Sequence, residues 1–285
     1  MKLRLVGGGR GRRVTVAVGA ALAIAAGCSD IPSDPQTPFA IEFNRAPGPS
    51  VVLGELLFDS LGEVQPLRAV VYNAKGDVIP GAPVTYHVAP DDTVPIMVDP
   101  TTGRVTAKSE SLYAGRTARV YAQAGGLQSG TVLVTVTRSA DALVAAGPVI
   151  DSVVLRFITV DSLPLAAGPS VRLVHKPPTP TSATDSLVPA YLVRFKIIRP
   201  ANDTSYVMLT NGDKKRSELD TTDASGVASR QIRIRRLKFP FSNSAAINDT
   251  IYDTVVVRSS AVKRGGTEVP GSGLLFRLII KARKQ

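Results

Sequence analysis

The chain has 285 residues, which is long enough for two β-sandwich modules of about 100 residues each. Hydrophobic residues make up 44% of it and aromatic residues 5%, with no Trp, and the single Cys excludes an internal disulfide. The formal net charge of +11 is unevenly spread, because residues 1–27 carry five cations and no anion. Residues 28–147 carry 8 basic and 12 acidic side chains, whereas residues 148–285 carry 21 and 11. This split predicts two domains and marks the second as the one that meets an acidic partner.

The N-terminus has the pattern of an export signal. Residues 1–13 are basic and rich in Gly, and residues 14–26 form an apolar run that ends in small residues. The run is too short to cross a bilayer as a helix, which needs about 20 residues. A positive region, a short apolar region and then small residues predict a secretory signal peptide over residues 1–27.

The end of this signal, from Ile24 to Cys28, resembles the lipobox of bacterial lipoproteins, although Ala25 stands where that motif prefers Leu. The resemblance implies that Cys28 is the lipid attachment site, that the chain is cut just before it, and that three acyl chains hold it to the membrane. Ser29 after the Cys permits the outer membrane, on the periplasmic or the surface side. Two alternatives stay open, namely cleavage by an ordinary signal peptidase and retention of an uncleaved anchor.

Residues 28–38 follow the signal and contain three Pro among Ser, Asp and Gln, which predicts a flexible tether. Residues 39–139 then alternate apolar and polar side chains in short runs, without helical periodicity. The runs centre on Ala69, Tyr86, Val120 and Val134, and turn residues such as those of 73–77 and 80–83 separate them. Short strands with turns every 8–12 residues predict an antiparallel β-sandwich.

The segment Val70–Tyr86 resembles the corresponding region of bacterial immunoglobulin-like domains, and so do Gly103–Ala107, Ala114–Ala118 and Ala124–Gly126, in the same order. The resemblance covers nearly the whole of residues 39–139. It implies an immunoglobulin-like fold, but it implies nothing about a ligand, because the matching positions are turn and core positions.

Residues 148–285 are predicted to form a second immunoglobulin-like sandwich, joined to the first by a linker over 139–148. Thr221–Ala228 resembles a hairpin of the invasin-type repeat. Long polar connections are expected at 176–188, 199–220 and 237–251. The fold class is therefore all-β, with two tandem immunoglobulin-like antiparallel β-sandwiches after a signal peptide and a short tether. The predicted strands of the second domain are Ser152–Val160, Ser170–His175, Tyr191–Ile198, Ala228–Arg235, Asp253–Ser259 and Gly273–Lys281.

Strand phase predicts a basic outer face on the second domain. Three of its strands, around residues 195, 256 and 277, correspond to strands that share one sheet in such sandwiches. If their alternate apolar residues point inward, the intervening cations point outward. One interpretation is that these cations keep the strands soluble and block edge pairing. The other is that they bind anionic polysaccharide or lipid head groups. The sequence leaves both interpretations open. The candidate residues are Arg194, Lys196, Arg258, Arg277 and Lys281, with Arg233 and Arg235 on the neighbouring sheet.

Constellations typical of catalysis are missing from the sequence. The two His residues, His87 and His175, fall in different domains without metal-ligand spacing, and no phosphate-binding or dinucleotide motif follows a strand. Two acidic pairs could form a carboxylate pair or a Ca²⁺ site, namely Asp220 with Asp223 and residue 91 with residue 92. We expect both pairs to stabilise turns instead. The Asn-x-Thr sites at 202–204 and 248–250 are read as loop residues. The basic half lacks interleaved stacking aromatics, so nucleic acid is not an expected partner.

These patterns favour a non-catalytic cell-envelope lipoprotein whose modules act as a spacer, scaffold or adhesion surface. The alternative is a surface protein that binds carbohydrate or another anionic polymer. No cofactor is expected, and the expected partners are the membrane, through the N-terminal lipid, and an envelope polysaccharide or protein.

Overall fold

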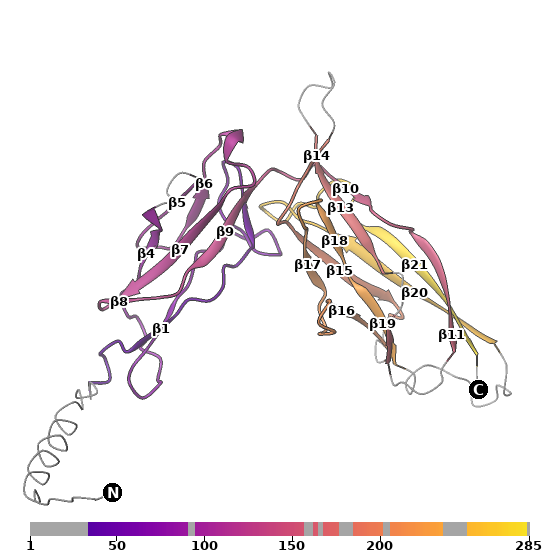
Figure 1. Ribbon diagram of the computed structural model, residues 1–285, viewed down its shortest axis with the longest axis horizontal. Coiled ribbons are helices and arrows are strands. Elements are labelled where there is room, and N and C mark those ends of the chain that lie inside the picture. Colours follow the sequence, from indigo (N-terminus) through magenta and orange to yellow (C-terminus); the bar gives the residue numbers. More distant parts are fainter. Residues whose placement is uncertain are drawn as a thin grey trace, which may run out of the picture.

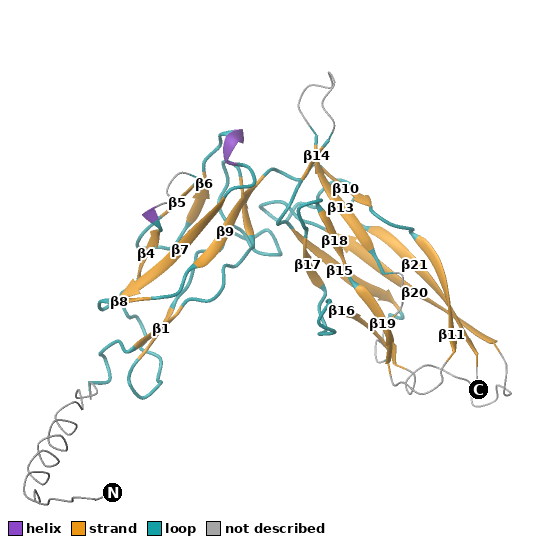
Figure 2. Cartoon of the chain, in the orientation of Figure 1, coloured by secondary structure: helices purple, strands orange, loops and turns teal. Residues whose placement is uncertain are grey.

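The computed structural model describes residues 34–90, 95–156, 162–164, 168–176, 185–201, 206–235 and 250–283. This part of the chain is almost entirely strand and turn, and it includes a three-residue 3-10 turn, η2, at Ser111–Tyr113 (Figure 2). None of its helices has the length and apolar character needed to cross a membrane. The predicted signal peptide, Cys28 and the start of the tether lie outside the described residues. The all-β fold class is confirmed.

The first domain consists of one five-stranded sheet, in the order β2-β9-β7-β4 with β8 beside β7, and two strand pairs, β1-β3 and β5-β6. Alternation in its long strands is as predicted, since Ala118, Val120 and Ala122 of β7 are buried, as are Val132 and Val134 of β9. The strand bounds are β1 Ala40–Glu42, β2 Ser50–Val52, β3 Val70–Tyr72, β4 Thr85–Val88, β5 Ile96–Val98, β6 Val105–Ala107, β7 Thr117–Ala124, β8 Leu127–Gln128 and β9 Val132–Thr137.

The second domain contains a five-stranded sheet in the order β11-β21-β20-β15-β17. A four-stranded sheet, in which β13 pairs with β10, β14 and β18, and a three-stranded sheet, β12-β19-β16, complete it. The strand bounds are β10 Ala142–Ala145, β11 Ile150–Arg156, β12 Ser162–Pro164, β13 Ser170–His175, β14 Ser186–Leu187, β15 Leu192–Arg199, β16 Val207–Thr210, β17 Leu219–Thr221, β18 Val227–Ser229, β19 Gln231–Arg235, β20 Thr250–Ser260 and β21 Leu274–Arg283.

The three strands predicted to share a sheet, β15, β20 and β21, are neighbours in the five-stranded sheet. Their predicted inward residues form the centre of the second core: Val193 and Phe195 are fully buried, and Val255, Val257 and Phe276 are buried beside them. The strand phase read from the sequence is therefore confirmed, because period-two patterning is a local property that tertiary packing did not override here.

Three features of the second domain differ from the sequence-based expectation. Four residues of the predicted linker form β10, which pairs with β13, so the linker is largely part of the second domain. The predicted strand Ala228–Arg235 is two strands that pair with different sheets and meet at the buried Arg230. The predicted loop 199–220 contains β16 and part of β17.

Both domains repeat one topological feature that the sequence did not reveal. An early strand pairs in parallel with the last strand of the same domain: β2 with β9 in the first, and β11 with β21 in the second. All other pairs among the described strands are antiparallel. The two sandwiches lie side by side in an inverted V and meet at its apex (Figure 1). Strand β1 lies at the free end of the first sandwich, and β11 runs to the free end of the second.

Candidate functional site

The cations predicted to form a basic face lie on three neighbouring strands of the five-stranded sheet. They alternate with core residues and therefore project from the side of the sheet that faces away from the core, which we call the outer face. A sixth cation, the exposed Arg199, follows a β-bulge in β15 and lies opposite Val256 on the same face. The five predicted cations are Arg194 and Lys196 on β15, Arg258 on β20, and Arg277 and Lys281 on β21.

These cations differ in what they contact. Arg258 forms an ion pair with Glu268, with Nη2 and Oε1 at 2.6 Å. Arg194 donates from Nη2 to Ser60 Oγ of the first domain at 3.1 Å. Lys196, Arg277 and Lys281 have no side-chain hydrogen bond or ion pair with any other described residue. Three of the five predicted site residues are thus available to a ligand, whereas the other two already have protein partners. Arg233 and Arg235 lie apart, on β19 of the three-stranded sheet.

Sequence reasoning missed the apolar side chains on the same outer face. Ile150, Val154, Tyr252 and Leu275 are exposed, and they lie in the same strands as the core residues Phe276 and Val255 or beside them. The signal was present, because apolar residues at outward positions break the rule that a solvated sheet face is polar. The outer face is therefore both cationic and apolar.

A second candidate site depends on how the domains meet, a contact that we call the junction. Two tight turns touch there: Asp59–Glu63 of the first domain and Lys263–Thr267 of the second. The Gly265 N–H donates to Gly62 O at 2.8 Å. Gly62 has φ +85°, and an added Cβ would overlap backbone atoms of Gly266 and Lys263. Only glycine lets the two backbones approach this closely.

The junction is apolar as well as hydrogen-bonded. Val52 and Phe58 belong by sequence to the first domain but are buried in the core cluster of the second. The Phe58 ring meets Tyr191 edge-on, with ring centroids 6.2 Å apart. Burial raises the pKa of Tyr191, whose hydroxyl donates to Val262 O at 2.9 Å. The domains thus share a core instead of touching only through polar surfaces.

Two hydroxyls at the ends of first-domain strands bind the backbone of the second domain at the junction. Thr137 Oγ1 donates to Pro189 O at 2.8 Å, and Ser50 Oγ donates to Ala190 O. Both hydroxyl-bearing residues are buried, so each hydrogen bond replaces water at a site that the second domain covers. These bonds restrict rotation about the connection between β9 and β10.

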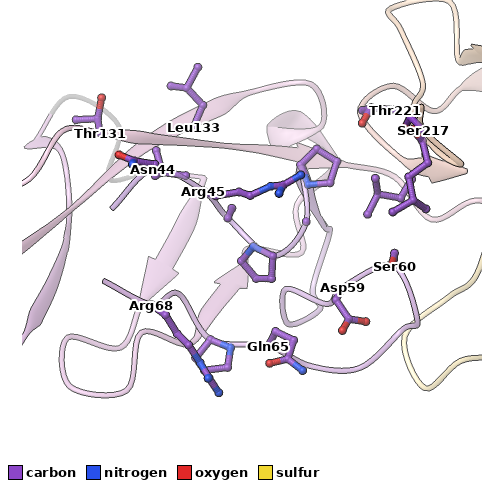
Figure 3. A pocket seen from close by; sticks show the side chains of 18 residues that line it. Asn44, Arg45, Asp59, Ser60, Gln65, Arg68, Thr131, Leu133, Ser217 and Thr221 are labelled. Carbon is purple, nitrogen blue, oxygen red and sulfur yellow. Dashed lines mark hydrogen bonds between the residues drawn. The ribbon is translucent and has the colours of Figure 1, made fainter. Parts of the chain in front are cut away.

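A groove of about 910 Å³ opens beside the junction and is lined by both domains (Figure 3). The first domain contributes Arg45, Arg68 and Asp59, and the second contributes Ser217 and Thr221. The two arginines are exposed and have no side-chain partner among the described residues, whereas Asp59 Oδ1 accepts from the backbone N–H groups of its own turn. The groove therefore presents two free cations and several hydroxyls, which suits an elongated anionic or hydroxylated ligand.

One cluster contains the residue types of a hydrolase triad but not its geometry. His175 Nδ1 lies 2.7 Å from Asp141 Oδ2 and 3.4 Å from Ser139 Oγ. In a triad the Ser and the acid occupy different ring nitrogens, so that His can pass a proton between Ser and substrate. Here both face the same nitrogen. Asp141 also accepts from the Lys176 N–H at 3.0 Å, so the cluster fixes the start of the second domain.

The acidic pairs named from the sequence have structural roles where they are described. Asp223 Oδ1 accepts hydrogen bonds from the N–H groups of Ser225 and Val227 and so stabilises a turn, as predicted. Asp220 forms an ion pair with the buried Arg230 at 2.7 Å. The described residues contain no group of three or more His, Cys, Asp or Glu suited to a metal.

The remaining sequence-based sites fall into two groups. His87 stacks on Tyr121, with ring centroids 5.3 Å apart, and contacts Thr85 Oγ1 at 3.1 Å, so it lies on a strand surface. Residues 91 and 92, and both Asn-x-Thr acceptor residues at 202 and 248, lie outside the described residues.

Comparisons with known proteins leave the family open. No protein-family model and no curated protein matches the chain. Among solved structures, domains EC1-2 of human protocadherin-24 are 19% identical over 87% of this chain and 99% of that one, with a TM-score of 0.26. Domains 4–9 of the surface layer protein SbsC are 10% identical over 88% and 32%, with a TM-score of 0.27. An endo-fucoidan hydrolase of glycoside hydrolase family 107 is 13% identical over 91% and 30%, with a TM-score of 0.25.

Such TM-scores carry no argument about function. The class of the protein rests on its own strands and cores, which define an all-β chain of two β-sandwiches.

Proposed function

We propose that the chain is a non-catalytic cell-envelope lipoprotein of the bacterial immunoglobulin-like kind, in which two docked sandwiches form a rigid scaffold and adhesion surface. The observation that carries this proposal is the junction, where Phe58 of the first domain is buried in the core of the second. A shared core and interdomain hydrogen bonds oppose the swinging expected of domains joined by a free linker. A rigid scaffold holds its binding surfaces at a fixed distance and orientation from its point of attachment.

The chemistry of the described side chains supports a non-catalytic role. The single Ser, His and Asp cluster has its Ser and Asp on one ring nitrogen, and the acidic pair at Asp220 and Asp223 serves a buried ion pair and a turn. Each of these groups is therefore committed to holding the backbone.

Attachment is proposed through lipid on Cys28, after removal of residues 1–27, with residues 28–38 as the tether to the outer membrane. Metabolic labelling with a lipid precursor tests this step. Label should enter the wild-type chain and be lost in Cys28→Ala, together with release of the protein from membranes. Ser29→Ala, which leaves the cysteine in place, is the matched control and should keep the label. An unlabelled wild-type chain would contradict the anchor.

A second candidate function, binding of an anionic polysaccharide, is favoured by the groove and its two unpartnered arginines, Arg45 and Arg68. A pull-down on acidic glycan beads should retain the wild-type chain and release it with added salt. The double variant Arg45→Gln/Arg68→Gln should lose retention, whereas Arg104→Gln, an exposed cation away from the groove, should not. Equal retention of all three proteins would remove the groove as a glycan site.

A further inference from the structure

The cations and the exposed apolar side chains of the outer face are ordered in rows across the sheet. Lys281 of β21 lies between Tyr252 of β20 and Val154 of β11. Two rows along, Arg277 of β21 lies between Val256 and Ile150 of the same neighbouring strands. Directly opposed residues have Cβ atoms about 4.5–5.5 Å apart, so each cation is flanked on both sides by an apolar side chain.

Three of the four apolar members of these rows are well exposed, and Val256 is half-buried. Tyr252, Val154 and Ile150 are 64%, 63% and 60% accessible to solvent. A single exposed apolar side chain is ordinary on a protein surface, but neighbouring ones on one sheet face mark a site of contact. We call Ile150, Val154, Tyr252, Arg277 and Lys281 the basic-apolar patch.

Charge restricts what can cover the patch. Among the described residues, the outward positions of β11, β15, β20 and β21 include six cations and no carboxylate. Asp151 and Asp253, the chain neighbours of Ile150 and Tyr252, occupy the intervening positions of their strands, and Glu268 is engaged by Arg258. A second copy of this face would bring like charges together without a partner, which disfavours face-to-face dimerisation. The charge complement of the patch is therefore an anionic surface that also accepts apolar side chains.

We propose that the basic-apolar patch binds the surface of an anionic lipid bilayer. A bilayer interface meets both requirements, because its head groups attract Lys and Arg while Tyr and aliphatic side chains enter the boundary of the acyl region. A soluble polysaccharide would satisfy the cations and leave Val154 and Ile150 in water. The patch would then be a second membrane contact, in addition to the lipid, so this inference rests on the proposed function.

The shape of the molecule allows both contacts at once. The inverted V places the free end of the second sandwich, with β11 and the end of β21, on the same side of the molecule as β1 (Figure 1). Residues 34–38 of the proposed tether are held at the first domain, where Asn73 Nδ2 donates to Pro35 O. The six residues from 28 to 33 reach at most about 20 Å when extended. A chain held by Cys28 can thus turn the end of β21 toward the membrane that holds the anchor.

Vesicle flotation tests the patch without the lipid. The chain from residue 28 onward, with Cys28→Ser, contains every residue that the structure describes. It should float with phosphatidylcholine vesicles that contain phosphatidylglycerol and stay behind with phosphatidylcholine alone. Binding should weaken about fivefold for each cation removed, hence about 25-fold in Arg277→Gln/Lys281→Gln. Tyr252→Ser should weaken it at least fivefold.

Matched controls on the first domain separate a specific patch from general charge. Lys75→Gln/Arg116→Gln removes two exposed cations, and Leu133→Ser removes an exposed apolar side chain; both proteins should bind like the wild type. Thermal unfolding of each variant verifies that its fold is retained. The proposal fails if the wild-type chain does not float with anionic vesicles. It also fails if the control substitutions weaken vesicle binding as much as the patch substitutions do, or if Tyr252→Ser leaves vesicle binding unchanged. The last result would assign the cations to a soluble polyanion instead. Lipid labelling at Cys28 is read independently, so either proposal can fail alone.

Discussion

Replacing Gly62 by Ala should separate the two domains while leaving each one folded. Gly62 has φ +85°, which costs an Ala about 1–2 kcal/mol in its own turn. The new Cβ would also lie 2.9 Å from Gly266 Cα, well inside the ordinary carbon contact of about 3.5–4.0 Å, and it would overlap the Gly266 N and Lys263 O atoms as well. Because these atoms are backbone, the overlap is relieved only by moving the second domain away. Gly76→Ala is the matched control, since Gly76 has φ +84° and open space around it.

Amide hydrogen exchange at Gly265 measures the separation, because its N–H donates across the junction to Gly62 O. If the overlap removes at least about 1.4 kcal/mol of docking free energy, this amide exchanges at least tenfold faster in Gly62→Ala. Gly76→Ala should pay the same backbone cost in overall stability without changing exchange at Gly265. Equal protection of Gly265 in the two variants would refute the reasoning that the turns are in close contact.

Three further predictions concern stability. Phe58→Ala should lower the free energy of unfolding by about 3–5 kcal/mol and, although Phe58 belongs to the first domain, should lower the midpoint of the second domain's transition in chemical denaturation. Arg230→Ala should cost about 3 kcal/mol in the same assay, because it leaves Asp220 without its partner. The backbone N–H groups of Thr102 and Thr101 donate to the Asp99 carboxylate and hold its pKa below 3.8 in the folded chain. The ionised carboxylate therefore contributes its full share of folding stability above pH 3.8. That stability is lost as the pH falls through the lower pKa of the folded state. Asp99→Asn should therefore lose less stability than the wild type between about pH 5 and pH 2, as measured by thermal unfolding.

The sheet faces could be predicted from the sequence because period-two patterning is local. Phe195, Val257 and Phe276 alternate with polar neighbours in their own strands, and that alternation was sufficient to place them in the core. The same reading set Arg277 and Lys281 on the outer face. Tyr252 and Val154 share this face although they are apolar, and alternation alone does not predict an apolar residue at an outward position.

The junction could not be predicted, because it depends on contacts between residues far apart in the sequence. Phe58 and Tyr191 both have the character of ordinary core residues, and nothing local indicates that one is buried in the other's domain. The sequence predicts a linker over 139–148, but Ala142–Ala145 forms β10 because it pairs with β13, a contact with residues 171–174. The sequence does contain a sign of the break between β18 and β19. Arg230 stands between them at an inward position, where a cation requires a buried partner.

The distance between the two domains tests the scaffold most directly. Spin labels at Gln128→Cys and Asp213→Cys, two exposed positions on different domains, can be placed in a Cys28→Ser chain, which has no other cysteine. Pulsed electron resonance should then give one narrow distance distribution in the wild-type background. A broad distribution, unchanged by Gly62→Ala, would mean that the domains swing and that the junction does not hold them.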